Sequence, residues 1–142
     1  MGPSSIRIIN AAAFAATLAA GTGERAAFEA LFLNGGTLNR NRLADREELL
    51  KLAKKDTVSG KPGLLARALR ESRAFITADT FLDAELVPGS GEYRAFETLF
   101  VRHGSMDQNR LDDRELLLKL KAKDLVGKQP GFVARCLTQF GV

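Results

Sequence analysis

Several residue types that carry chemistry are scarce in this chain: it has no tryptophan and only one tyrosine, one histidine and one cysteine in 142 residues. A single cysteine excludes an intrachain disulfide, so the fold has to rest on its apolar core, and the composition is compatible with a reducing cytoplasm. His103 and Cys136 have no second histidine or cysteine with which to form a nucleophile–base pair or a metal site. We therefore expect both residues to be structural.

Long hydrophobic runs and a large excess of one charge are also missing. No apolar stretch approaches the roughly 18–20 residues that span a membrane. The apolar stretch at 10–20 loosely resembles a signal peptide, but its counterpart at 76–88 lies in mid-chain, so we interpret it as a helix. The net charge of +4 permits an acidic partner but is too small to predict a nucleic-acid-binding protein. We expect a soluble chain without a transmembrane segment; the composition does not determine its compartment.

The most informative feature present is an internal repeat. Residues 6–73 and 74–141 align without a gap, and about 30 of the 68 paired positions are identical. NRLADREELLKL at 41–52 recurs as NRLDDRELLLKL at 109–120, and PGLLARAL at 62–69 recurs as PGFVARCL at 130–137. Self-similarity at a fixed period indicates a duplicated supersecondary unit. We expect the two repeats to form one compact domain.

Each repeat is expected to contain four short helices. Apolar residues spaced three and four apart predict helices over 10–20, 24–33, 44–55 and 62–72, and again over 78–87, 92–101, 112–123 and 130–139. Pro62 and Pro130 are expected in the first turn of the last helix of each repeat, where proline is well tolerated. Because no segment alternates convincingly with period two, the predicted fold class is all-α.

The two middle helices of each repeat resemble an EF-hand. Phe28 and Phe32 precede a loop at 36–47, with Leu43 at its eighth place and Glu47 at its twelfth. Around a second loop at 104–115, the corresponding residues are Phe96, Phe100, Leu111 and Glu115. The resemblance covers about 20 residues in each repeat and implies a helix–loop–helix unit.

The calcium ligands of that family are mostly missing. Calcium takes six to eight oxygen ligands, many of them at the first, third and fifth loop places. Those places hold Gly36, Leu38 and Arg40 in the first loop, and Gly104, Met106 and Gln108 in the second. We therefore expect loops without a metal and a chain without a cofactor. Weak calcium binding by Asp107, Asp112 and Glu115 is the alternative.

Two charged motifs recur in both repeats. Asp45-Arg46-Glu47 recurs as Asp113-Arg114-Glu115, but adjacent helical residues diverge by about 100°, so we interpret the motif as helix capping with an arginine bridge. Gly-Lys pairs at 60–61 and 127–128 precede the last helix of each repeat. This arrangement predicts either an ordinary Gly/Pro turn before a helix or an anion site at the start of the helix, formed by Lys61, Arg67, Lys128 and Arg135.

No nucleophile, base or metal set recurs in a form that predicts catalysis. We therefore predict a non-enzymatic protein-binding or regulatory module that takes an amphipathic helix or short peptide into a groove between helices. The residues expected to line the groove, each with plain core as the alternative, are Phe28, Phe32, Leu65, Phe96, Phe100 and Phe132. Binding of nucleic acid or of an anionic surface through the basic loops is the alternative function, although the chain has no nucleic-acid-binding signature.

Overall fold

Helices make up most of the secondary structure in the computed structural model, which describes residues 5–142. They are α1 (Ala11–Ala15), α2 (Gly23–Phe28), α3 (Leu43–Lys55), α4 (Leu64–Glu71), α5 (Ala78–Glu85), α6 (Gly91–Phe96), α7 (Leu111–Lys123) and α8 (Phe132–Gln139). Two π-helical turns, η1 (Glu29–Leu33) and η2 (Glu97–Val101), continue α2 and α6. The predicted helical character is confirmed, but α1 is shorter than the helix predicted over 10–20.

Within residues 5–142, eight two-residue strands form four antiparallel pairs that the sequence did not predict. Two pairs are local hairpins: β3 (Thr57–Val58) with β4 (Lys61–Pro62), and β7 (Leu125–Val126) with β8 (Gln129–Pro130). The other two pairs are long-range: β1 (Ile8–Ile9) with β6 (Met106–Asp107), and β2 (Leu38–Asn39) with β5 (Phe75–Ile76). A strand of two residues is too short to show period-two alternation, so the sequence pattern could not reveal these pairs.

The two proline residues lie outside the helices in which they were predicted. Pro62 and Pro130 end the strands β4 and β8, and Gly63 and Gly131 are the N-cap residues of α4 and α8. The prediction was wrong because these helices begin two residues later, where their first backbone N–H groups meet buried acceptors.

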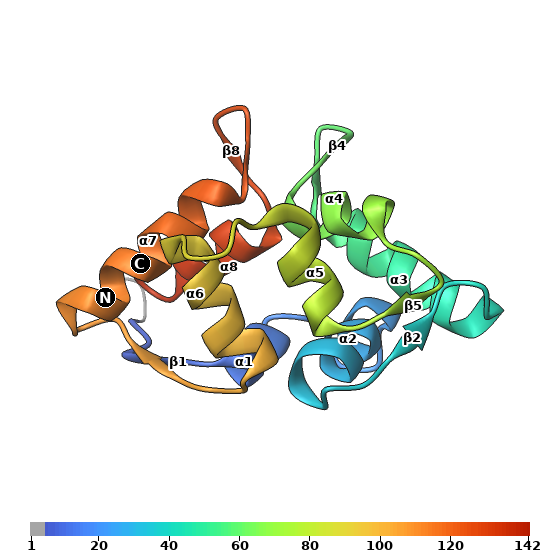
Figure 1. Ribbon diagram of the computed structural model, residues 1–142, viewed down its shortest axis with the longest axis horizontal. Helices are drawn as coiled ribbons and strands as arrows, with labels where there is room; N and C mark the ends of the chain where they lie inside the picture. The colour runs from blue at the N-terminus through green and yellow to red at the C-terminus, as the bar shows by residue number, and fades with distance from the viewer. Residues whose placement is uncertain (1–4) are drawn as a thin grey trace.

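The first segment of each half crosses over to the other half (Figure 1). Strand β1 pairs with β6, and β5 pairs with β2. After α1, Thr17 Oγ1 lies 3.3 Å from Cys136 Sγ of α8, and the rings of Phe14 and Phe140 are 5.1 Å apart. Helix α5 packs on α4 in the same reciprocal way. Residues 6–73 and 74–141 are therefore interlocked rather than set side by side.

The register between the halves changes after this first segment. Asn10 and Thr77, which cap α1 and α5, are 67 residues apart, whereas Gly23 and Gly91, which begin α2 and α6, are 68 apart. The gap-free alignment is therefore wrong for the first helix of each half. Phe14 corresponds to Phe81, and both rings are buried.

One hydrophobic cluster joins both halves. Eight of the nine phenylalanines are buried in it, and only Phe75 is largely exposed. The Phe100 ring lies 5.0 Å from that of Phe14, 5.2 Å from Phe32 and 4.9 Å from Phe96. Edge-to-face packing at such distances adds to the stabilisation from burial. Neither half encloses a core of its own.

A strained residue follows η2. His103 has a φ of +54°, in the left-handed region, whereas the equivalent position after η1 is Gly35, with a φ of +64°. Non-glycine residues are disfavoured in this region. A Cβ added at Gly35 would lie 3.2 Å from His103 Cε1, so the two positions also face each other.

Replacing His103 by glycine is therefore expected to raise the free energy of unfolding by about 0.5–1 kcal/mol, because relief of backbone strain outweighs the added freedom of the unfolded chain. Chemical denaturation followed by circular dichroism measures the change. Gly35→Ala is the matched control and should lower stability by about 1 kcal/mol or more. A destabilised His103→Gly variant would show instead that imidazole contacts dominate at this position.

Candidate functional site

The residues predicted to line a groove are core residues. Phe28, Phe32, Leu65, Phe96, Phe100 and Phe132 are at most 3% exposed. Their apolar faces meet across the interlocked halves, so neither half leaves them open to solvent. Helical periodicity identified the apolar face correctly, but it could not show that the other half covers that face. A partner-binding surface therefore has to be sought elsewhere.

The predicted anion site does not form either. Lys61 and Lys128 are exposed at the hairpin turns, whereas Arg67 and Arg135 bind other groups of the protein. Arg67 Nε lies 2.6 Å from Glu85 Oε1, and its guanidinium also donates to the carbonyls of Pro62 and Lys123. Arg135 donates to the carbonyls of Pro130 and Lys55. The helix starts are closed to an anion, because two aspartates already occupy them.

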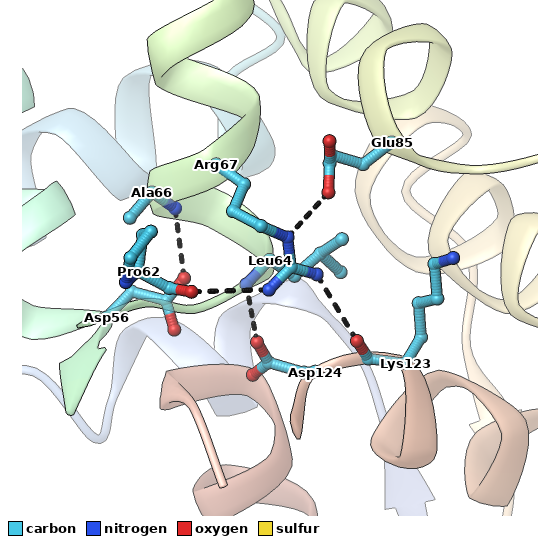
Figure 2. Close-up of polar contacts among 8 residues, drawn as sticks. All are labelled: Asp56, Pro62, Leu64, Ala66, Arg67, Glu85, Lys123 and Asp124. Carbon is cyan, nitrogen blue, oxygen red and sulfur yellow. Dashed lines mark hydrogen bonds and ion pairs between the residues drawn. The ribbon is translucent and has the colours of Figure 1, made fainter. Parts of the chain in front are cut away.

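Those aspartates, Asp56 and Asp124, form a reciprocal joint between the halves. Figure 2 shows the hydrogen bonds from Ala66 to Asp56 and from Leu64 to Asp124. They close α3 and α7, and both are fully buried. Asp56 accepts from Ala66 N of its own half at 3.0 Å and from Phe132 N of the other half at 2.6 Å. Asp124 accepts from Ala134 N at 2.9 Å and from Leu64 N at 2.7 Å. Each carboxyl thus caps one helix in each half.

Burial raises the pKa of both carboxyls above the ordinary range of aspartate. For Asp124, burial is the largest cause and the neighbouring charge of Asp56 adds to it, which raises its pKa to about 6 in spite of the backbone donors. For Asp56, burial likewise outweighs the backbone hydrogen bonds and the nearby Arg135. Both groups lie against Gly131, where an added Cβ would overlap Asp124 Oδ1. No room is left there for a substrate, so the pair is structural.

This pair was not predicted from the sequence, although a usable signal was present. Asp56 and Asp124 recur at equivalent positions, directly after a leucine-rich helix and seven residues before the glycine of a Pro-Gly pair. Recurrence alone could not show that the two side chains would be buried together. That outcome depends on how the halves are interlocked.

The alternative metal ligands do not converge. Asp107 accepts from Asn109 N at 2.9 Å and pairs with Arg7 at 3.1 Å, while Asp112 and Glu115 are exposed on α7. Within residues 5–142, no three histidine, cysteine, aspartate or glutamate side chains lie close enough to hold a metal ion. Helix α7 begins at Leu111, so the second half of the segment 104–115 is helical. Leu43 begins α3 in the same way, and its side chain is 71% exposed.

The recurrent Asp-Arg-Glu motif shapes the loops. Asp45 accepts from Asn39 N at 2.9 Å, and Asp113 accepts from Asp107 N at the same distance. Both carboxyls therefore tie the preceding loop to the helix. The sequence had suggested that they cap the helix itself, and that prediction was wrong. Arg42 pairs with Asp45 at 3.8 Å.

A surface crevice opens between α3 and α4. Its apolar lining consists of Leu49, Leu50, Ala53, Ala66, Leu69 and Ile76, and Arg40, Arg46 and Arg70 complete it. We call it the arginine-rimmed crevice; its volume is about 110 Å³. Leu50 is 56% exposed, so an apolar side chain already faces solvent there.

The charges at this crevice are only partly compensated. The Arg40 guanidinium donates to the Ser72 carbonyl. Arg46 and Arg70 are exposed, and no carboxylate of residues 5–142 lies within 4.0 Å of either guanidinium. The crevice thus combines an apolar lining with a cationic rim.

A wider groove beside α2 and α3 has a different character. Its lining includes Arg25, Glu29, Glu47, Glu48 and Lys51, so both signs of charge are present. Arg25 pairs with Glu29 at 3.6 Å and donates to the Leu18 carbonyl. Because these charges largely compensate one another, the groove favours no particular ligand.

Comparisons with known proteins identify no relative. No family model matches the chain, and no match is found among curated proteins or solved structures. Within residues 5–142, no helix has both the length and the apolar character needed to cross a membrane. The function therefore has to be argued from the crevice and the chemistry around it.

Proposed function

We propose that this protein is a non-enzymatic protein-binding module built from two tandem helical repeats, at 6–73 and 74–141. In this proposal each repeat contains an EF-hand-like helix–loop–helix unit that lacks calcium ligands. The observation that carries the proposal is the arginine-rimmed crevice between α3 and α4, with Leu50 exposed at its edge.

The size of the crevice favours a protein partner over a metabolite. Small-molecule sites usually enclose about 300–1,000 Å³, whereas the crevice holds about 110 Å³. Protein interfaces often place an apolar side chain in a small pocket and enrich arginine around it. The crevice has both features.

The titratable groups support binding rather than catalysis. Asp56 and Asp124 are buried and their oxygens are occupied by backbone donors. Burial raises the pKa of the Cys136 thiol to about 11, so it stays protonated at neutral pH and is a poor nucleophile. The ionisable residues at the crevice are arginines, which do not give up a proton and cannot act as a general base.

Site-specific photo-crosslinking tests the proposal. A photoreactive residue in place of Leu50 is expected to form discrete adducts with one or a few proteins in native lysate. The matched control is Leu118, the equivalent leucine of α7, which is 41% exposed and should not form these adducts. Filling the crevice with Ala53→Trp should suppress the adducts at position 50.

Three results would count against a protein-binding crevice: no adduct at position 50, the same adducts at position 118, or adducts with nucleic acid only. The last result would support the second candidate, binding of nucleic acid or an anionic surface. One observation favours that candidate: the two hairpins carrying Lys61 and Lys128 project side by side from the same part of the molecule (Figure 1).

A further inference from the structure

We infer that the arginine-rimmed crevice binds a short acidic peptide segment of a partner protein, which inserts one branched aliphatic side chain between α3 and α4. This inference rests on the proposed function and adds the chemistry of the recognised segment. In the second half of the protein, the end of the described chain is hydrogen-bonded at the equivalent place.

In the second half, Val142 is hydrogen-bonded to two residues that correspond to residues of the crevice lining. Its N–H donates to the Leu137 carbonyl at 2.9 Å, and Lys121 Nζ donates to Val142 O at 3.1 Å. The Val142 side chain is only 9% exposed and belongs to the hydrophobic cluster. Lys121 and Leu137 stand 68 residues after Ala53 and Leu69, which line the crevice. The C-terminal end of the described chain accordingly lies beside α7 (Figure 1).

In the first half, the chain leaves this place open. After α8 the chain turns back at Gly141, whose φ of +95° favours glycine. After α4 it runs from Ser72, with a ψ of 151°, into strand β5. Ala74, which is 68 residues before Val142, does not line the crevice. Its carbonyl accepts a hydrogen bond from Arg40 N at 2.8 Å. The first half thus has no equivalent, within residues 5–142, of the hydrogen bonds that hold Val142 in the second half.

The volume of the crevice suits one aliphatic side chain. An engineered apolar cavity of about 150 Å³ accommodates benzene, and the crevice, at about 110 Å³, is somewhat smaller. A valine or leucine side chain is therefore the expected guest. Larger aromatic rings fit this space poorly.

The rim determines the charge of the expected segment. Arg40 and Arg70 replace Gln108 and Thr138 of the second half, whereas Ala53 replaces Lys121, so the first half carries one more cation at this place. In the second half, Arg114 donates to Gln108 Oε1 at 3.0 Å. In the first half, Arg40 stands in place of that glutamine, and the equivalent Arg46 has no carboxylate partner within residues 5–142. Guanidinium groups pair with carboxylates through bidentate hydrogen bonds. Aspartate or glutamate next to the inserted residue would supply that partner.

A designed peptide provides the test. The probe is an acetylated and amidated pentapeptide with a central leucine and two aspartates on each side, titrated into the isotopically labelled full chain and followed by NMR. We expect saturable binding with the largest amide shifts at Leu49, Ala53 and Leu69. Replacing the leucine by glycine, or the four aspartates by asparagines, should weaken binding by at least about tenfold.

Matched charge variants locate the interaction. The double variant Arg46→Glu/Arg70→Glu should also weaken peptide binding by at least about tenfold. Arg102→Glu, at an exposed arginine outside the crevice, should change the affinity for the peptide much less for each residue substituted. Equal weakening by Arg102→Glu would show a nonspecific charge effect and overturn the inference. So would equal affinity for the asparagine peptide, displacement by a short oligonucleotide, or no saturable binding at millimolar peptide.

The crosslinking experiment separates the inference from the proposed function. If adducts at position 50 persist in the Arg46→Glu/Arg70→Glu variant, the protein-binding crevice stands and the acidic segment is wrong. If both the adducts and the peptide binding are absent, the proposed function fails as well.

Discussion

Replacing Phe100 by alanine is expected to lower the free energy of unfolding by about 3–5 kcal/mol, as for other fully buried aromatic residues. Phe100 has no exposed surface, and its ring lies within 5.8 Å of the rings of Phe14, Phe28, Phe32 and Phe96. These partners come from both halves, so alanine would leave a cavity where the halves meet. Urea denaturation followed by circular dichroism measures the loss.

Phe75 provides the matched control for Phe100. It is the same residue type but is 68% exposed in strand β5. Phe75→Ala should therefore change stability by no more than about 0.5 kcal/mol. A loss below about 1 kcal/mol for Phe100→Ala would contradict the shared core, because a cavity of that size cannot be so well tolerated.

Asp124→Ala is expected to lower the free energy of unfolding by about 2–5 kcal/mol, since it removes two buried acceptors at once. Leu64 N and Ala134 N would then be left without their hydrogen-bond partner. Asp124→Asn keeps one acceptor oxygen and should lose less stability. Asp112→Ala, at an exposed acid in the first turn of α7, is the control and should change stability by no more than about 1 kcal/mol.

The pH dependence of stability provides an independent test of the same joint. The pKa of Asp124 is about 6 in the folded protein and about 4 in the unfolded chain, so the folded state binds its proton more tightly. The contribution of Asp124 to the free energy of unfolding is fully present below about pH 4 and is lost as the pH rises through about 6. The difference between the two pKa values corresponds to a loss of roughly 3 kcal/mol in the free energy of unfolding. Asp56, whose pKa is also raised, acts in the same direction.

Denaturation curves between pH 4 and 8 would show this effect. The wild type should lose more stability across the range than Asp124→Asn, because asparagine does not titrate. Parallel pH profiles for the two proteins would mean that Asp124 stays ionised when folded. That result would contradict the burial-driven rise of its pKa, while leaving its two backbone hydrogen bonds to be tested by Asp124→Ala.

Much of the local structure could be predicted from the sequence. The leucine spacing predicts helices over 44–55 and 112–123, and α3 and α7 differ from them by one residue at the start. The apolar faces containing Phe28, Phe32, Phe96 and Phe100 are also those that become buried. These features depend on neighbouring residues of the chain, and periodicity reports them directly.

The candidate site could not be predicted in the same way. Arg70 lies 24 residues after Arg46, and only the packing of α3 and α4 brings it to one crevice with Arg40 and Arg46. The role of Asp56 and Asp124 likewise depends on backbone donors from the other half. Periodicity cannot show which surfaces meet, so it assigned the buried phenylalanines to a groove.

The sequence by itself determined the helices, the residues that form the apolar core and the scarcity of catalytic residue types, because each depends on composition or short-range spacing. The tertiary structure decided how the halves interlock, that two recurrent aspartates are buried between them, and that Val142 is held beside α7 while a crevice is open between α3 and α4. The physical reason is that burial and charge compensation depend on what covers a surface, and in this protein the covering segments come from the opposite half of the chain.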